Sequence, residues 1–188
     1  MVQKLDYLIE SASQTAGPYV HIGCTPNFCG IHGIYDQDLG LTPFSPEAAG
    51  ERISISGSVY DGTGTVLRDV MLESWQADGD GVYGPGTQGF ARFAADQDSG
   101  VWTLNTVKPG SRDGQAPHIA LWIVARGINI GLQTRIYFDG DDHASDPLLN
   151  RIEHRNRVAT LVAQPEGSGN WHFDVRLQGD GETVFLDL

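Results

Sequence analysis

From residue 52 onward, apolar and polar residues alternate along several stretches of the chain. In segment 52–59, Ile53, Ile55 and Val59 fall on one side, with polar residues between them. Successive side chains of a β-strand point to opposite faces, so a period of two predicts a half-buried strand. Similar patterns predict strands over 66–76, 100–107, 132–138, 171–177 and 183–186.

Segment 118–126 differs from these because it is almost continuously apolar, which predicts a central strand. Turns are expected at 61–64 (Asp-Gly-Thr-Gly) and at 179–181 (Gly-Asp-Gly). Seven or more short strands joined by turns predict an all-β fold. We therefore expect a β-sandwich of mixed short strands with long irregular loops, an extended N-terminal arm and one short helix.

The short helix is expected after Asp146 and Pro147, which supply an N-cap and a proline at the first helical position. Leu148, Leu149 and Ile152 follow at helical spacing. Residues 1–50, by contrast, show no sustained period, because prolines at 18, 26, 43 and 46 interrupt every pattern. We predict a single domain over 1–188, with an irregular arm at 1–50 that packs on its own domain or on a partner, and a sandwich core at 51–188.

The composition favours a soluble globular protein with many turns, since 188 residues include 24 glycines and 9 prolines. Asp and Glu outnumber Lys and Arg by 24 to 12, giving a net charge of −12. The chain has no basic run and no apolar stretch of about 20 residues. These features argue against nucleic acid and membrane as partners. The N-terminus lacks the apolar segment of a signal peptide, so a cytoplasmic location is expected.

Two small motifs suggest metal binding only weakly. Cys24 and Cys29 are the only cysteines, and without a second pair nearby they are expected to be reduced thiols; a metal site or a disulfide is the alternative. The sequence Asp-Gly-Asp-Gly at 78–81 begins like a calcium loop but lacks the later ligands. We expect it to form a turn.

Four segments in a fixed order carry a more specific signal. They are 75–83 (Trp-Gln-Ala-Asp followed by Gly-Val-Tyr), 106–110 (Thr-Val-Lys-Pro-Gly), 116–119 (Ala-Pro-His-Ile) and 134–138 (Thr-Arg-Ile-Tyr-Phe). Together they resemble the core of the intradiol ring-cleavage dioxygenases over about residues 52–140. The tail segments 177–179 and 182–185 extend the resemblance. The arm segment 13–21 narrows it to the α chains of two-chain members that cleave protocatechuate.

The resemblance implies a ferric ion held by two tyrosinates and two histidines in the active chains of the family. Tyr83 and His118 match one ligand of each kind. The second histidine position holds Ala120, and segment 111–116 contains no tyrosine but brings a cation, Arg112. We therefore expect no metal in this chain and a vestigial pocket at Tyr83, Arg112, His118 and Ala120. Replacement of the missing ligands by Asp141 and His143 is the less favoured alternative.

The resemblance further implies a β subunit of like fold that holds the Fe(3+). The α arm then contributes to the substrate opening of that subunit, at positions matched here by Thr15, Gly17, Pro18 and Arg126. An arginine suits this role because its guanidinium binds a carboxylate such as that of protocatechuate through two N–H groups. The alternative is that Arg126 pairs with an acidic residue of the partner.

The implied activity of the complex is cleavage of protocatechuate by O2 to 3-carboxy-cis,cis-muconate, a step of aromatic catabolism in the β-ketoadipate pathway. The isolated chain is expected to be inactive. Two other functions are compatible with the residues: a self-sufficient intradiol dioxygenase with a degenerate site, and a β-sandwich binding module without a catalytic role.

Overall fold

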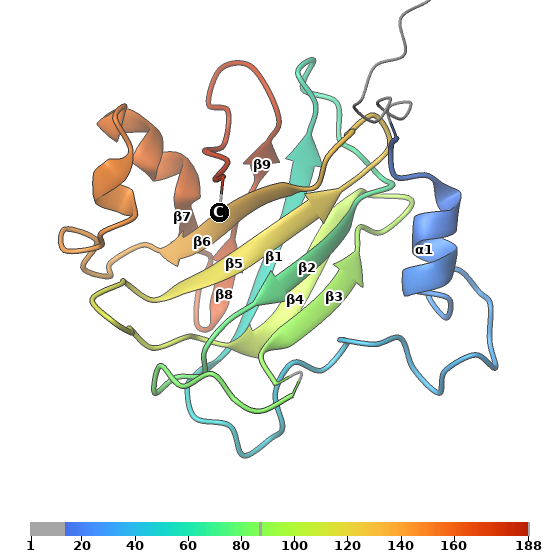
Figure 1. The fold of residues 1–188 in the computed structure, drawn as a ribbon, viewed down its shortest axis with the longest axis horizontal. Helices are drawn as coiled ribbons and strands as arrows, with labels where there is room; N and C mark the ends of the chain where they lie inside the picture. Colours follow the sequence, from blue (N-terminus) through green and yellow to red (C-terminus); the bar gives the residue numbers. More distant parts are fainter. Residues whose placement is uncertain (1–13, 87, 188) are drawn as a thin grey trace, which may run out of the picture.

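The computed structural model describes residues 14–86 and 88–187 and consists mainly of β-strands (Figure 1). The strands are β1 (Arg52–Tyr60), β2 (Met71–Trp75), β3 (Phe90–Ala94), β4 (Val101–Val107), β5 (His118–Val124), β6 (Leu132–Phe138), β7 (Val162–Pro165), β8 (Asn170–His172) and β9 (Val175–Arg176). The helices are α1 (Pro18–Cys24) and the 3₁₀ helices η1 (Leu149–Arg151) and η2 (Arg155–Leu161). None of the helices in these ranges is long and apolar enough to cross a membrane.

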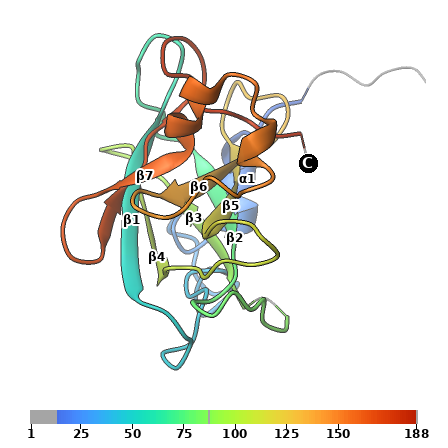
Figure 2. The ribbon, with the colours of Figure 1, turned by 90° about the vertical axis from the view of Figure 1, so that its left-hand side faces the viewer.

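The strands follow one hydrogen-bonded path, in the order β3-β2-β5-β6-β7-β8-β1-β4, and β9 pairs with β1. Strands β3, β2, β5 and β6 are antiparallel neighbours, whereas β6 pairs with β7, and β1 with β8, in parallel. The path folds over on itself, so β1 and β4 lie behind the layer of β2, β5 and β6 (Figures 1 and 2). The predicted all-β, sandwich-like class with mixed strands is confirmed.

The main core lies between the two layers, where alternate side chains of each strand meet. Trp102 and Leu104 of β4 are buried, whereas the residues that alternate with them are exposed. Ile119 and Leu121 of β5 face them from the other layer in the same apolar cluster. The period of two therefore identified the buried face of these strands correctly, because apolar area leaves water on one face only.

The predicted strand 171–177 is broken into β8 and β9. At the break, Phe173 donates its backbone N–H to Ser56 O (2.9 Å), and the Asp174 side chain accepts from the Ser58 N–H (2.9 Å). Gly57 lies between these two contacts, and a Cβ there would come within 1.8 Å of Phe173 O. The pairing changes at this point because the two backbones approach too closely for any residue larger than glycine.

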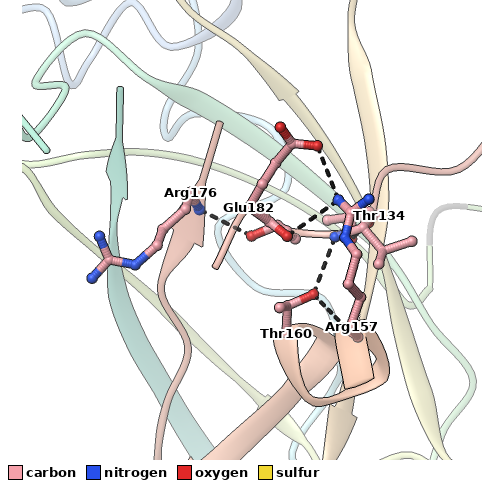
Figure 3. Close-up of polar contacts among 7 residues, drawn as sticks. Thr134, Arg157, Thr160, Arg176 and Glu182 are labelled. Carbon is pink, nitrogen blue, oxygen red and sulfur yellow. Dashed lines mark hydrogen bonds and ion pairs between the residues drawn. The ribbon is translucent and has the colours of Figure 1, made fainter. Parts of the chain in front are cut away.

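Segment 183–186 is not a strand, as the alternation had predicted, but an irregular strap tied down by polar contacts (Figure 3). Thr134 donates to Val184 O (2.8 Å), and the Arg176 N–H donates to the Thr183 hydroxyl (2.9 Å). Arg157 pairs with Glu182 at 2.9 Å. The Thr134 side chain thus satisfies the Val184 carbonyl, which would accept from a backbone N–H of a neighbouring strand in a regular sheet.

Several other elements differ from the sequence prediction. Helix α1 forms inside the arm, because Pro18 stands at its first turn, where a missing N–H costs nothing. The predicted strand 66–76 is shortened to β2, and β3, β7 and η2 were not predicted. The arm packs on its own chain at least in part, since Pro43 O accepts from the Gly89 N–H (2.8 Å) and Gly40 O from the Arg92 N–H (3.1 Å).

A short helix follows Asp146 and Pro147 as predicted, but it is a single 3₁₀ turn, Leu149–Arg151, whose N-cap is Leu148 and not Asp146. One oxygen of the Asp146 side chain accepts from the backbone N–H groups of Leu148 (2.8 Å) and Leu149 (2.9 Å). The other oxygen accepts from the Ala116 N–H at 2.9 Å. Asp146 is fully buried, so this carboxylate joins the segment that precedes β5 to the helical turn.

Candidate functional site

Four side chains on one face of β5 and β6 occupy the region where the sequence predicted a vestigial metal pocket. In the strand register, His118 stands opposite Tyr137, and Ala120 stands opposite Arg135. Residues two apart in a strand point to the same face. His118, Ala120, Arg135 and Tyr137 therefore form one compact group, which we call the β5–β6 patch.

Arg135 places a positive charge in the β5–β6 patch beside the missing histidine. Its Nη1 donates to Gln115 Oε1 at 2.7 Å and to the Tyr137 hydroxyl at 3.3 Å. The guanidinium therefore extends along the patch from the position opposite Ala120. A cation of the protein itself thus stands opposite Ala120, the position where the family resemblance implies the second histidine.

The pKa values of Tyr137 and His118 are both shifted in the direction that favours the neutral form. Burial raises the pKa of Tyr137 to about 12, although the hydrogen bond from Arg135 acts in the opposite direction. Burial likewise lowers the pKa of His118, and the charge of Arg135 adds to this effect, while a hydrogen bond to Ala116 O opposes it. The Nδ1 atom of His118 lies 2.8 Å from that carbonyl, which can only accept, so Nδ1 carries the proton.

Tyr83 and Arg112 lie together in a stack beside the patch. The Tyr83 ring stacks on Trp75 with centroids 6.1 Å apart and planes inclined by 11°, and the Arg112 guanidinium carbon lies 5.4 Å from the Tyr83 centroid. Trp75 stands opposite Ala120 in the pairing of β2 with β5. Contacts therefore link all four residues of the predicted pocket, and Tyr83 is partly exposed rather than enclosed.

These residues do not fit a ferric ion, which is a hard cation that prefers anionic oxygen ligands. The phenol of Tyr83 lies against the cation of Arg112, and Ala120 faces the cation of Arg135. Within residues 14–86 and 88–187, no three His, Cys, Asp or Glu side chains are grouped so as to hold a metal. Two guanidinium groups near the ligand positions would oppose a trivalent cation by charge repulsion.

The two replacement ligands considered from the sequence have other neighbours. Asp141 forms a salt bridge with Lys108 at 2.8 Å. The His143 ring packs edge-on against Tyr137, with centroids 5.7 Å apart. From the sequence, Asp146 was identified only as a helix cap and Arg135 and Tyr137 only as members of the motif 134–138, and none of the three was predicted to belong to the pocket. The signal that could have found Arg135 and Tyr137 is their alternation on strand 132–138, which places both on the face that meets His118.

A second region gathers the residues predicted to serve a partner's site. Gly17, Pro18 and Arg126 line a cavity of about 430 Å³ between the arm and the end of β5, which we call the arm pocket. Further lining residues are Ile22, Phe28, Ile31, Arg68 and Asp69. The Arg126 side chain is 69% exposed, and its Nε lies 3.3 Å from an oxygen of Asp69. The pocket thus combines an apolar wall with exposed positive charge.

Thr15, the fourth residue of that prediction, lies beside the arm pocket but does not line it. Its hydroxyl accepts from the Gly127 N–H at 2.8 Å and contacts Ala125 O at 3.4 Å. The structure therefore brings all four predicted residues to one place, with Thr15 against the backbone on both sides of Arg126.

The β5–β6 patch and the arm pocket lie at opposite ends of one strand. His118 begins β5, and Arg126 follows two residues after its end at Val124. At about 3.3 Å per residue, the two regions are separated by roughly 25 Å. Arg126 is consequently too far away to serve a ligand bound at the β5–β6 patch of its own chain.

The fold and these motifs are those of a known class of enzymes. A family model described as "Dioxygenase" matches residues 24–179, and the chain belongs to this dioxygenase family. Within it, the chain is 44% identical, over 98% of its length and 99% of the relative's, to a protein named protocatechuate 3,4-dioxygenase alpha chain from Pseudomonas putida. It is 30% identical to a protein named protocatechuate 3,4-dioxygenase beta chain from Burkholderia cepacia, over 80% of this chain and 75% of that one.

A solved structure shows the same fold at lower sequence identity. The dioxygenase domain of a dioxygenase carbohydrate-binding protein fusion from Streptomyces sp. SirexAA-E superposes with a TM-score of 0.60. The match covers 77% of this chain and 88% of the other, at 24% identity. This likeness places the strand arrangement described above within the dioxygenase fold.

Proposed function

We propose that this chain is the iron-free α subunit of a protocatechuate 3,4-dioxygenase. Similarity to a named α chain over nearly the whole length supports this assignment, and the lower similarity to a β chain supports a partner of like fold. With that β subunit, the complex cleaves protocatechuate between its two hydroxylated carbons. Both atoms of O2 enter the product, 3-carboxy-cis,cis-muconate. The reaction is a step of aromatic catabolism in the β-ketoadipate pathway, and we assign the complex to the cytoplasm.

Iron dependence is general in intradiol dioxygenases, and we assign the Fe(3+) to the β subunit. The observation that carries this assignment is the pair of guanidinium groups at the β5–β6 patch, Arg112 against Tyr83 and Arg135 opposite Ala120. Tyr137, with its pKa near 12, is a neutral phenol and not a tyrosinate at physiological pH. The patch therefore favours its own internal hydrogen bonds over a metal.

The arm pocket is the region that we assign to the shared site. Arg126 lies roughly 25 Å from the β5–β6 patch of its own chain at 3.3 Å per residue, so its exposed guanidinium cannot serve that patch but is available to a site formed with another chain. A negatively charged substrate approaching a protein of net charge −12 needs local positive charge. Arg126 supplies that charge, and the backbone of Gly17 and Pro18 forms the adjoining wall.

Co-expression of this chain with a β chain of the same enzyme class tests the proposal. We expect the two chains to co-purify, with ferric iron and its tyrosinate charge-transfer absorption accompanying the β chain. The chain expressed alone is expected to bind no stoichiometric iron and to leave protocatechuate uncleaved. Iron bound by the lone chain, or activity of the lone chain, would contradict the assignment.

A further inference from the structure

The loop that carries Arg126 is a tight turn held from outside by the arm. The Ile128 N–H donates to Ala125 O at 3.1 Å, so Arg126 and Gly127 are the two central residues of the turn. Gly127 has a φ of +89°, a conformation that glycine adopts without strain and that type II turns require at this position. In this arrangement the Gly127 N–H needs a partner from elsewhere.

Thr15 provides that partner from more than a hundred residues away in sequence. Its hydroxyl oxygen accepts from the Gly127 N–H at 2.8 Å, and its proton points to Ala125 O at 3.4 Å. A hydroxyl has one proton to donate, so the Ala125 contact uses the donor that a direct contact with a substrate oxygen would need. In Figure 1 the described part of the arm begins beside the loop between β5 and β6.

The side chain of Arg126 is held at a different point. Its Nε lies 3.3 Å from Asp69 Oδ2, and the side chain is 69% exposed. A carboxylate binds best to two parallel N–H groups of a guanidinium, so the direction of this group matters for affinity. Thr15 contacts the backbone on both sides of Arg126, and Asp69 contacts its side chain.

We infer that Thr15 is a positioning residue that acts through Arg126: its hydroxyl holds the turn and thereby sets the direction in which the guanidinium is presented to a carboxylate. This inference rests on the proposed function and deepens it. It assigns to Thr15 an indirect role, in place of the direct substrate contact that the sequence suggested.

The first test is local and needs no substrate. In the purified complex, we expect Thr15→Val to speed hydrogen exchange of the Gly127 amide by about five-fold, the effect of losing one ordinary hydrogen bond. Thr15→Ser keeps the hydroxyl and should restore slow exchange. Thr103→Val, at an exposed strand position, is the matched control and should leave Gly127 unchanged. Equal exchange in wild type and Thr15→Val would overturn the inference.

The second test is a double-mutant cycle measured by steady-state kinetics. Thr15→Val is expected to raise the KM for protocatechuate about five-fold with little change in kcat, and Thr15→Ser to restore it. In an Arg126→Ala background, Thr15→Val should add nothing, because the group that it positions is gone. A full additional effect in that background would mean that Thr15 contacts substrate itself, which contradicts the inference.

The role proposed for Arg126 and the positioning role inferred for Thr15 can be rejected by different results. If Arg126→Ala alone leaves the KM unchanged, then the role proposed for Arg126 is wrong and the inference falls with it. If Arg126→Ala raises the KM but Thr15→Val does not, then the proposed function stands and the positioning role of Thr15 is rejected.

Discussion

The β5–β6 patch and the arm pocket each contain an arginine, but the two arginines have opposite surroundings. Arg135 bonds to Gln115 and to the buried Tyr137 inside its own chain. Arg126 has a side chain that is 69% exposed and pairs through Nε with Asp69 at the rim of a cavity. Arg135 therefore joins parts of its own fold through Nη1, although its buried Nε has no hydrogen-bond partner among the described residues, whereas an exposed guanidinium can bind a ligand.

The family resemblance implies a metal site at the β5–β6 patch, whereas the exposed positive charge of Arg126 lies at the arm pocket. The patch retains Tyr83 and His118, two residue types that bind iron in the family. Arg112 and Arg135 nevertheless bring positive charge to this region, where they contact Tyr83 and Tyr137. The identity of two residues is therefore a weaker guide to metal binding than the charge of the whole group of side chains.

The largest effect is expected from Asp146, which supports the patch from behind. Asp146→Ala removes the acceptor of three backbone N–H groups in a fully buried position. We expect a loss of about 3–5 kcal/mol in the free energy of unfolding, measured by urea denaturation, because each buried donor left unpaired costs about 1–3 kcal/mol. Asp146→Asn keeps one acceptor oxygen and should lose clearly less. Equal losses would show that the hydrogen bonds are not the cause.

Arg126→Ala should produce the opposite result, with changed function and unchanged stability. We expect the KM of the complex for protocatechuate to rise about ten-fold or more, since a charge-assisted contact contributes about 1.5–3 kcal/mol. Iron content should not change, and the free energy of unfolding should stay within about 0.5 kcal/mol of wild type. Catechol, which lacks the carboxylate, is the matched substrate and should show no such rise in KM.

A smaller effect is expected from the titration of His118. Its pKa in the folded chain lies below the ordinary value of 6.5, so the unfolded chain binds this proton more readily. Stability should consequently fall as the pH drops below about 6.5, until the folded-state pKa is passed. His118→Gln should flatten this part of the stability–pH curve measured by denaturation. His32→Gln, at an exposed residue of the arm, is the control and should leave the slope intact.

The smallest change is expected from restoring one ligand to the patch. Ala120→His recreates the alternate histidines of the family on β5, but Arg135 still stands opposite that position. We expect the variant to bind no stoichiometric ferric iron when the lone chain is analysed for metal. Iron binding by the single variant would show that the lost histidine, and not the charge of Arg135, is what excludes the metal.

Much of the fold could be predicted because burial imposes a period of two on a strand. The alternation in 100–107 identified β4 and its buried face, and the apolar run after 118 identified β5 near the middle of the sheet path. Strand β3 was missed because its five residues follow a glycine-rich loop and are too short for a pattern. Segment 183–186 has the alternation of a strand but is held by isolated backbone bonds from Thr183 and Leu186 together with side-chain contacts, and not by a continuous strand pairing.

The residues of the candidate site likewise divide into those that the sequence identifies and those whose place depends on the folded structure. Tyr83, His118, Ala120 and Arg112 could be recognised from the sequence because each lies in or beside a motif at fixed spacing. The face of Arg135 follows from the alternation on strand 132–138, but its position opposite Ala120 depends on the register between β5 and β6. A register is set by packing over two whole strands and by the loop that joins them, and no short motif records it.

By itself, the sequence determined the all-β class, a short helix after Asp146, and the lack of a histidine at position 120 and of a tyrosine in 111–116, because alternation, helix signals and residue identity depend on neighbouring residues. Only the tertiary structure decided which side chain faces Ala120 and what Thr15 contacts. Both depend on contacts between distant segments: Arg135 faces Ala120 across two strands, and Thr15 holds a turn 112 residues away. Such contacts form because folding buries the apolar faces of the strands together, and the polar groups then bond to whatever this packing brings beside them.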